Sequence, residues 1–179
     1  MEADWEVEIG GGAPVIEADW PGFVDLQSHP DRIADIPEAV AFPPLARLLL
    51  SLNAPESPLW TAKCGLWEPE PAALAVYVDV LPREGAVFGE WKHAEAFCRE
   101  FVGRLGAIVL PKCGPECGID LVIRQAIAGG VDGFGITAYL SAKGAVQEDA
   151  ETALAAMMAG FPDALPGHKP PTTAGEKLQ

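Results

Sequence analysis

Two cysteines lie four positions apart in the stretch LPKCGPECG at residues 110–118. Cys113 and Cys117 could form half of a zinc site, a redox pair, or two ordinary thiols in a loop. A structural zinc site needs a second pair of ligands, and Cys64 and Cys98 are instead expected on the buried faces of a strand and a helix. The spacing therefore favours an ordinary loop. Cys113 and Cys117 remain weak metal-ligand candidates, and no cofactor is expected.

A thiol-dependent enzyme or redox protein centred on Cys113 and Cys117 is the alternative. A reactive thiol needs a lowered pKa, which arises beside cations or at the start of a helix. Lys112 is the only basic residue in this stretch, Glu116 opposes its effect, and the residues that follow are typical of a strand. With His93 as a candidate general base, these two cysteines and Lys112 are the catalytic candidates, and an ordinary loop stays the favoured interpretation.

Acidic residues concentrate near the start of the chain. The formal net charge is −14, and the first 46 residues hold ten Asp or Glu residues against one basic residue. Such a surface repels phosphate backbones, so nucleic acid is disfavoured as a ligand, whereas a basic protein partner is favoured. Plain solubility explains the same charge and is preferred to a specific basic partner as its explanation. Within this region Glu6, Glu8, Glu17 and Asp19 are the candidate binding residues.

The five tryptophans form a compositional excess. Most of them are expected in the core, where aromatic rings bury a large area. In SPLWTAKCGLW, alternation places Trp60 and Cys64 together on the core face of a strand. Trp67, at the end of that strand, is therefore the candidate for an exposed anchor that contacts a protein partner.

Hydrophobic periodicity predicts a series of strands and helices. Residues 4–9 alternate between apolar and acidic side chains, and the glycines at 10–12 permit a reversal, so the N-terminal region is expected to be a hairpin or a sheet edge. Apolar residues at helical spacing predict further helices, one of which restarts at the prolines 43 and 44. The predicted helices cover residues 35–53, 88–105 and 146–161, the last closed by Pro162, and the predicted strands cover residues 57–67, 73–81, 118–127 and 133–142. The last two strands are joined by AGGVDG, whose glycines and Asp132 are typical of a hairpin turn, so they are expected to pair antiparallel.

This order of elements predicts the fold. Strand, helix, strand, strand, helix and strand follow one another in the ferredoxin-like βαββαβ arrangement, with an added C-terminal strand and helix. We expect an α+β fold with an antiparallel sheet and helices on one face. The expected organisation is one domain over residues 1–162, followed by a flexible tail over residues 163–179.

Composition and motifs together favour a binding protein over an enzyme. No apolar run approaches the ~20 residues of a membrane span, and the N-terminus is acidic where a secretory signal is basic, so a cytoplasmic protein without membrane contact is expected. The favoured function is a non-catalytic binding or regulatory module, in its sharper form an acidic inhibitor or immunity-type protein that covers a basic partner. A homodimer formed through an exposed sheet face is a further alternative.

Overall fold

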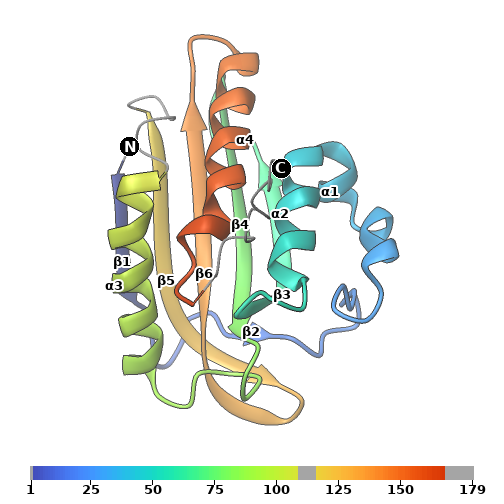
Figure 1. Ribbon diagram of the computed structural model, residues 1–179, viewed down its shortest axis with the longest axis vertical. Helices are drawn as coiled ribbons and strands as arrows, with labels where there is room; N and C mark the ends of the chain where they lie inside the picture. The colour runs from blue at the N-terminus through green and yellow to red at the C-terminus, as the bar shows by residue number, and fades with distance from the viewer. Residues whose placement is uncertain (1, 109–115, 168–179) are drawn as a thin grey trace, which may run out of the picture.

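The computed structural model describes residues 2–108 and 116–167, and its strands form one six-stranded sheet (Figure 1). The strands are β1 (Glu2–Val7), β2 (Ile16–Glu17), β3 (Leu59–Trp67), β4 (Ala73–Pro82), β5 (Cys117–Ala128) and β6 (Val131–Lys143). The helices are the 3₁₀ helix η1 (Pro30–Asp35) and the α-helices α1 (Pro37–Ala41), α2 (Pro43–Asn53), α3 (Trp91–Ile108) and α4 (Gln147–Ala164). The α+β class is confirmed.

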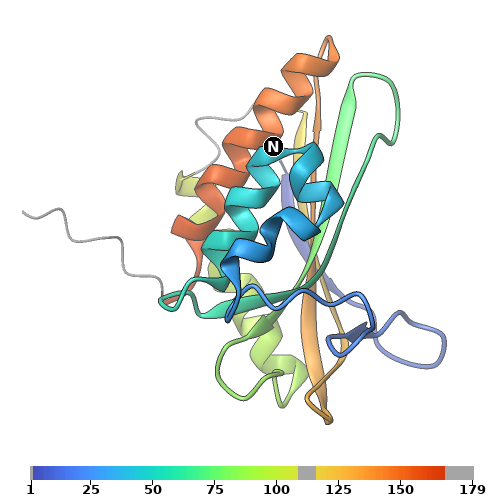
Figure 2. The same ribbon diagram turned by 90° about the vertical axis from the view of Figure 1, so that its right-hand side faces the viewer.

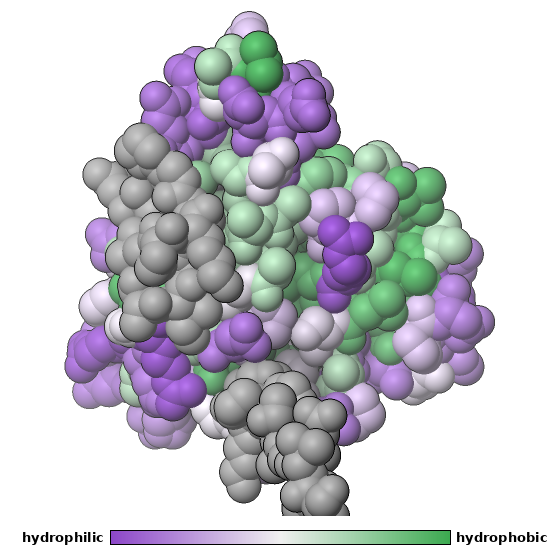
Figure 3. All heavy atoms as spheres, turned by 45° about the horizontal axis from the view of Figure 1, so that its top comes forward, coloured by the Kyte–Doolittle hydropathy of each residue, from purple (hydrophilic) through white to green (hydrophobic). Residues whose placement is uncertain are grey.

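The α-helices lie on one face of the sheet. α3 packs over β1 and β5, α4 over β6 and β4, and α2 over β3. Figure 2 shows the helices as one layer beside the sheet, while the segment between β1 and η1 crosses the lower part of the opposite face. On the helix side, apolar residues reach the surface where α1 and α2 lie (Figure 3). The two faces of the sheet therefore have different cover.

The strand order corrects the expected topology. The sheet runs β1-β5-β6-β4-β3, and β2 pairs with β5 along the same edge as β1. Both β1 and β2 are parallel to β5, whereas the remaining pairs are antiparallel, so the sheet is mixed. The N-terminal region is an edge and not a hairpin. The specific ferredoxin-like topology is not confirmed, because the first strand lies at the edge of the sheet.

The long hairpin of β5 and β6 confirms the predicted antiparallel pair. Ala128 pairs with Val131 across a two-residue turn formed by Gly129 and Gly130. Their φ angles are 57° and 74°, which glycine adopts without a steric penalty and which a type I′ hairpin turn requires at both positions. The turn fixes the register, and the register decides which side chains of β5 and β6 share a face.

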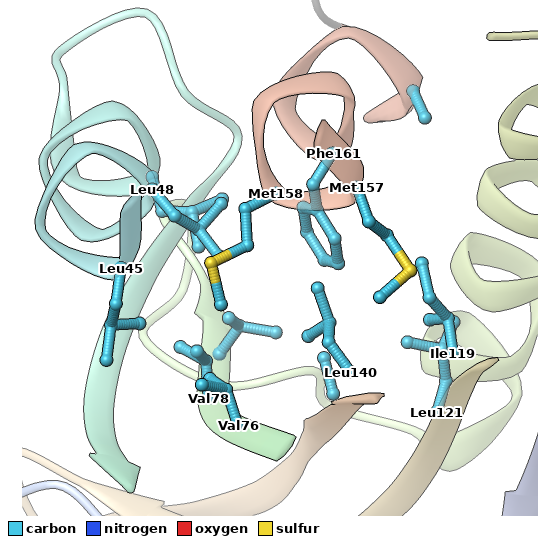
Figure 4. Packing of buried hydrophobic residues seen from close by; sticks show 14 of the residues in the cluster. Leu45, Leu48, Val76, Val78, Ile119, Leu121, Leu140, Met157, Met158 and Phe161 are labelled. Carbon is cyan, nitrogen blue, oxygen red and sulfur yellow. The ribbon is translucent and has the colours of Figure 1, made fainter. Parts of the chain in front are cut away.

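The main hydrophobic core lies between the helices and the sheet. α2 and α4 each present one apolar stripe, and these stripes meet alternate residues of β4, β5 and β6 (Figure 4). Leu45 and Leu48 come from α2, Met157, Met158 and Phe161 from α4, and Val76, Val78, Ile119, Leu121 and Leu140 from the strands. Burial of this apolar surface is the main stabilising contribution to the fold.

A β-bulge in β3 overturns one expectation about side-chain faces. The pairing register with β4 shifts between Thr61 and Lys63, so the alternation changes face at this point. Trp60 packs in a small cluster on the face opposite the helices, whereas Cys64 packs against the helix-side core. The prediction that Trp60 and Cys64 share one face is therefore wrong, because strict alternation assumes a strand without bulges.

Helix α4 continues beyond the predicted limit at Pro162. Pro162 lies inside the helix, and Ala164 and Leu165 behind it are buried. Arg104 of α3 donates a hydrogen bond to the carbonyl oxygen of Leu165 at 3.0 Å. This contact and the buried apolar residues hold the last turn, where the missing N–H of a proline removes only one helical hydrogen bond. Residues 168–179 of the predicted tail lie outside the described residues.

Candidate binding site on the open face of the sheet

The face of the sheet opposite the helices is only partly covered, and we name it the open face. Its lower end is covered by the segment that contains Ile16 and Ala18, which packs on Leu81 and Ala126. Above this cover the strands present mostly polar and aromatic side chains, because alternation turns the apolar residues toward the helices. They are Asp4 and Glu6 of β1, Lys63 and Trp67 of β3, Tyr77 and Asp79 of β4, Asp120 and Arg124 of β5, and Thr137 and Tyr139 of β6.

A pocket of about 270 Å³ lies where this polar surface meets the N-terminal segment. We name it the open-face pocket. Residues 14–17 and Trp20 form one side of it. The sheet supplies the other side, through Lys63, Tyr77, Asp79, Arg124 and Tyr139. Three strands, β3, β4 and β5, therefore bring charged groups to one place, and β6 adds an aromatic ring.

Asp79 is the most deeply placed charged group of the pocket. It belongs to β4, which lies between β6 and β3 in the sheet, and is 8% exposed. Thr137 of β6 donates a hydrogen bond from Oγ1 to Asp79 Oδ1 at 2.6 Å. Burial raises the pKa of Asp79, although the Thr137 hydrogen bond and the charges of Arg124 and Lys63 act in the opposite direction. The fold thus holds a carboxylate where its charged form is disfavoured.

Arg124 is held by partners on three sides. Its Nη2 and Nε donate to Glu8 Oε2 at 2.8 and 3.1 Å. Its Nη1 donates to Thr137 Oγ1 and to the Tyr139 hydroxyl, both at 3.2 Å. The Arg124 side chain is 13% exposed and that of Glu8 43%. The guanidinium is therefore a fixed part of the pocket, and its charge is balanced by Glu8.

Aromatic rings form the upper part of the site. Tyr77 and Tyr139 lie on neighbouring strands with their ring centroids 6.2 Å apart, and Trp67 packs against both rings at 6.3 and 6.4 Å. Gly65 makes room for Tyr77, because a Cβ at this position would come within 2.3 Å of the Tyr77 ring. Burial and the charge of Asp79 raise the pKa of Tyr77 to about 12, so its hydroxyl stays protonated at neutral pH.

Trp20 forms the wall between this pocket and a neighbouring cavity. Its Nε1 donates a hydrogen bond to the carbonyl oxygen of Ala62 at 3.1 Å, and its ring packs on Gly22, where a Cβ would come within 1.9 Å of the ring. The ammonium of Lys63 lies 5.5 Å from the ring centroid. This distance is typical of a cation–π contact. The neighbouring cavity, also about 270 Å³, extends along β3 toward Glu38.

Of the predicted binding residues, Glu8, Glu17 and Trp67 belong to the open-face pocket or contact its residues, whereas Glu6 and Asp19 lie away from it. Glu17 lines the open-face pocket, and Glu8 takes part through its ion pair with Arg124. Trp67 is 40% exposed and contacts two rings of the site. Glu6 lies further along β1, and Asp19 accepts a hydrogen bond from the Gly129 N–H at 2.8 Å, where it holds the β5–β6 turn.

The predicted thiol site is not brought together by the described part of the chain. Cys117 begins β5 and is buried in the helix-side core. His93 is exposed in the first turn of α3. Shortly before it in the sequence, Phe88 pairs with Phe134 of β6, and Phe134 lies opposite Gln125 of β5. Since Cys117 and Gln125 are separated by about 26 Å along β5, His93 and Cys117 lie toward opposite ends of the strand.

Cys113 and Lys112 lie outside the described residues, so a thiol function at Cys113 and Cys117 stays a prediction. Burial, more than nearby carboxylates, raises the pKa of Cys64 to about 12. Burial likewise raises the pKa of Cys98 to about 12. Neither of these two thiols is therefore prepared for nucleophilic chemistry. Over residues 2–108 and 116–167, no group of three or more His, Cys, Asp or Glu side chains is placed to hold a metal ion.

Asp79 and Arg124 are the two central residues that the sequence interpretation missed. Both carried a signal, because each is a charge within a mostly apolar stretch of a strand: AVYVDVL for Asp79 and LVIRQAI for Arg124. A charge at such a position is expected to be paired or functional. Their common location depends on the register of β4, β5 and β6, which the sequence alone did not supply.

Comparisons with known proteins leave the site to be interpreted from its own geometry. Neither the protein-family models, nor the curated proteins, nor the solved structures give a match to this chain. Among the helices that the structure describes, none combines the length and apolar character needed to cross a membrane.

Proposed function

We propose that this protein is a non-catalytic binding module whose open face binds a basic protein partner. The observation that carries the proposal is the charge of this face. The carboxylates of Asp4, Glu6, Glu8, Glu17, Asp79 and Asp120 outnumber the cations of Lys63, Arg124 and Lys143. An uncovered face with this excess attracts a basic surface and accelerates its association.

The chemistry of the pocket supports binding more than catalysis. Arg124 has its hydrogen bonds filled by Glu8, Thr137 and Tyr139, and Asp79 already accepts a hydrogen bond from Thr137. Within the described part of the chain, neither a cysteine nor a histidine lines the open-face pocket. Aromatic rings beside charged groups are typical of anchor sites in protein interfaces. In its sharper form, the module is an inhibitor or immunity-type protein that covers a basic functional surface.

A homodimer through the same face is disfavoured by charge. Two copies related by a twofold axis would bring the same acidic surface against itself, and like charges in contact oppose association. Light scattering distinguishes the two cases. We expect the mass of a monomer at neutral pH and low salt, and twice that mass would support the dimer.

The proposal is tested by affinity purification of the tagged protein from its own cells at about 50 mM and about 500 mM salt. We expect a basic protein that is retained at low salt and released at high salt. The variant Glu6→Lys/Glu17→Lys changes two exposed residues of the open face and should lose this partner. Glu148→Lys/Glu151→Lys makes the same charge change at exposed positions of α4 and should retain it. Equal retention by both variants would contradict the proposal.

A further inference from the structure

The charges of the open-face pocket do not cancel. Arg124 and Glu8 neutralise each other through their two hydrogen bonds at 2.8 and 3.1 Å. The lining then holds the carboxylates of Asp79 and Glu17 against the single ammonium of Lys63. A ligand that neutralises the remaining negative charge of the pocket is therefore a cation.

Asp79 has an oxygen left for such a cation. Its Oδ1 accepts the hydrogen bond from Thr137 at 2.6 Å. No described residue donates a hydrogen bond to Oδ2, and no ion pair joins Asp79 to Lys63 or Arg124. The carboxylate lies at the base of the pocket, where the surrounding protein strengthens a charge-assisted hydrogen bond.

The walls of the pocket suit a flat cation. Tyr77 and Tyr139 lie on neighbouring strands and line the pocket, and Arg124 already lies over the Tyr139 ring at 5.6 Å from its centroid. Trp20 holds the ammonium of Lys63 in the same way at 5.5 Å. Two aromatic rings of this lining thus have cations of the protein itself beside them, a contact that a ligand cation can make in the same way.

We infer that the open-face pocket binds the guanidinium group of an arginine side chain of the basic partner, an inference that rests on the proposed function. A guanidinium stacks on aromatic faces and donates hydrogen bonds in its plane, so it can pack against Tyr77 and Trp20 while it donates to Asp79 Oδ2. The volume of about 270 Å³ suits one side chain. Lys63 is an exposed residue of the lining and acts as an internal competitor, which the incoming arginine displaces from Trp20.

Asp79 and Lys63 line one pocket and should have opposite effects on the binding of an arginine probe. Binding of N-acetyl-L-arginine amide, followed by tryptophan fluorescence or NMR, should weaken about tenfold or more in Asp79→Asn, because a hydrogen bond to a charged group is lost. Lys63→Met should bind the same probe several-fold more tightly, because a competing cation is removed. N-acetyl-L-citrulline amide, a neutral molecule of the same shape, should not bind. Circular dichroism and thermal unfolding of both variants are the controls that they are folded.

The other outcomes overturn the inference in distinguishable ways. Loss of binding of the arginine probe in Lys63→Met would mean that Lys63 supports the bound group and does not compete with it, and equal binding of the citrulline probe would mean that charge is irrelevant. Tighter binding of free L-arginine than of the capped amide would identify a small guanidine compound, not a partner's side chain, as the ligand. Capture of a basic partner that Asp79→Asn leaves unchanged would overturn the arginine pocket but retain the proposed function. Probe binding without any basic partner would instead refute the proposed function.

Discussion

On the face covered by helices, β4 contributes Val76, Val78 and Val80 to the main core, whereas on the open face the same strand contributes Tyr77 and Asp79. Both sets come from one strand that is buried for most of its length. Burial on this sheet therefore serves two purposes. One face excludes water to stabilise the fold, and the other holds charged groups in fixed positions at some cost in stability.

The largest effect is expected from a change on the covered face. Leu140 is fully buried against the helices, so Leu140→Ala should lower the free energy of unfolding by about 2–5 kcal/mol. The neighbouring Ser141 points to the open face, and Ser141→Ala should change it by less than about 0.5 kcal/mol. Urea unfolding of the two variants measures the contrast. Similar losses would mean that the two faces do not differ in this way.

The next effect concerns the ion pair of the open face. Arg124→Met removes four hydrogen bonds around a mostly buried guanidinium and should lower the free energy of unfolding by about 1–3 kcal/mol. Arg32→Met breaks the exposed pair with Asp35 and should lower it by less than about 1 kcal/mol. If the two losses in chemical denaturation were equal, Arg124 would be an ordinary surface residue and the pocket would lack a fixed wall.

The positions of most elements followed from the sequence, because alternation and helical spacing depend on local burial. The restart of the helix at Pro43 was predicted from the prolines and the β5–β6 hairpin from the glycines of its turn, and both are present. The parallel edge was not predictable, since β1 pairs with a strand more than a hundred residues later. The bulge after Thr61 was also missed, because one extra residue leaves no distinct pattern in the sequence.

The candidate site was predictable only in part. Glu8, Glu17 and Trp67 were named as partner-binding residues from the acidic N-terminal region and the aromatic excess. In the structure Glu17 lines the open-face pocket, Glu8 pairs with Arg124, and Trp67 packs on Tyr139. Asp79 and Arg124 were not named, although they organise the site. Each has its partners on other strands, so their role follows from sheet register, which single-sequence patterns do not determine.

The smallest effect, and the one with an unusual sign, concerns Asp79. Because burial raises its pKa in the folded state, the folded protein binds a proton more readily than the unfolded chain, and stability falls as pH rises through that range. Asp79→Asn keeps an oxygen for Thr137 and removes the charge. At pH 7 it should be as stable as the wild type or more stable, by up to about 1 kcal/mol.

The pH dependence of this difference separates the charge from other effects of the substitution. Below about pH 4 the wild-type carboxyl is protonated as well, so the advantage of Asp79→Asn should vanish. The groups that face Asp79 are Lys63 of β3, Tyr77 of β4, Arg124 of β5, Thr137 and Tyr139 of β6, and Glu17 beside the pocket. Thermal unfolding between pH 3 and pH 8 gives the measurement, and a variant that is clearly less stable at pH 7 would show that burial of the Asp79 charge does not destabilise the fold.

The most direct test of the binding role of the open face is an NMR titration of the ¹⁵N-labelled protein with N-acetyl-L-arginine amide. The indole N–H of Trp20 donates to Ala62 at the pocket wall, while that of Trp91 lies on α3 and provides an internal reference. We predict that the Trp20 indole and the amides of Lys63, Tyr77 and Asp79 shift together with one dissociation constant, while the Trp91 indole does not move. Shifts spread over the helices, with the Trp20 indole unchanged, would contradict the account.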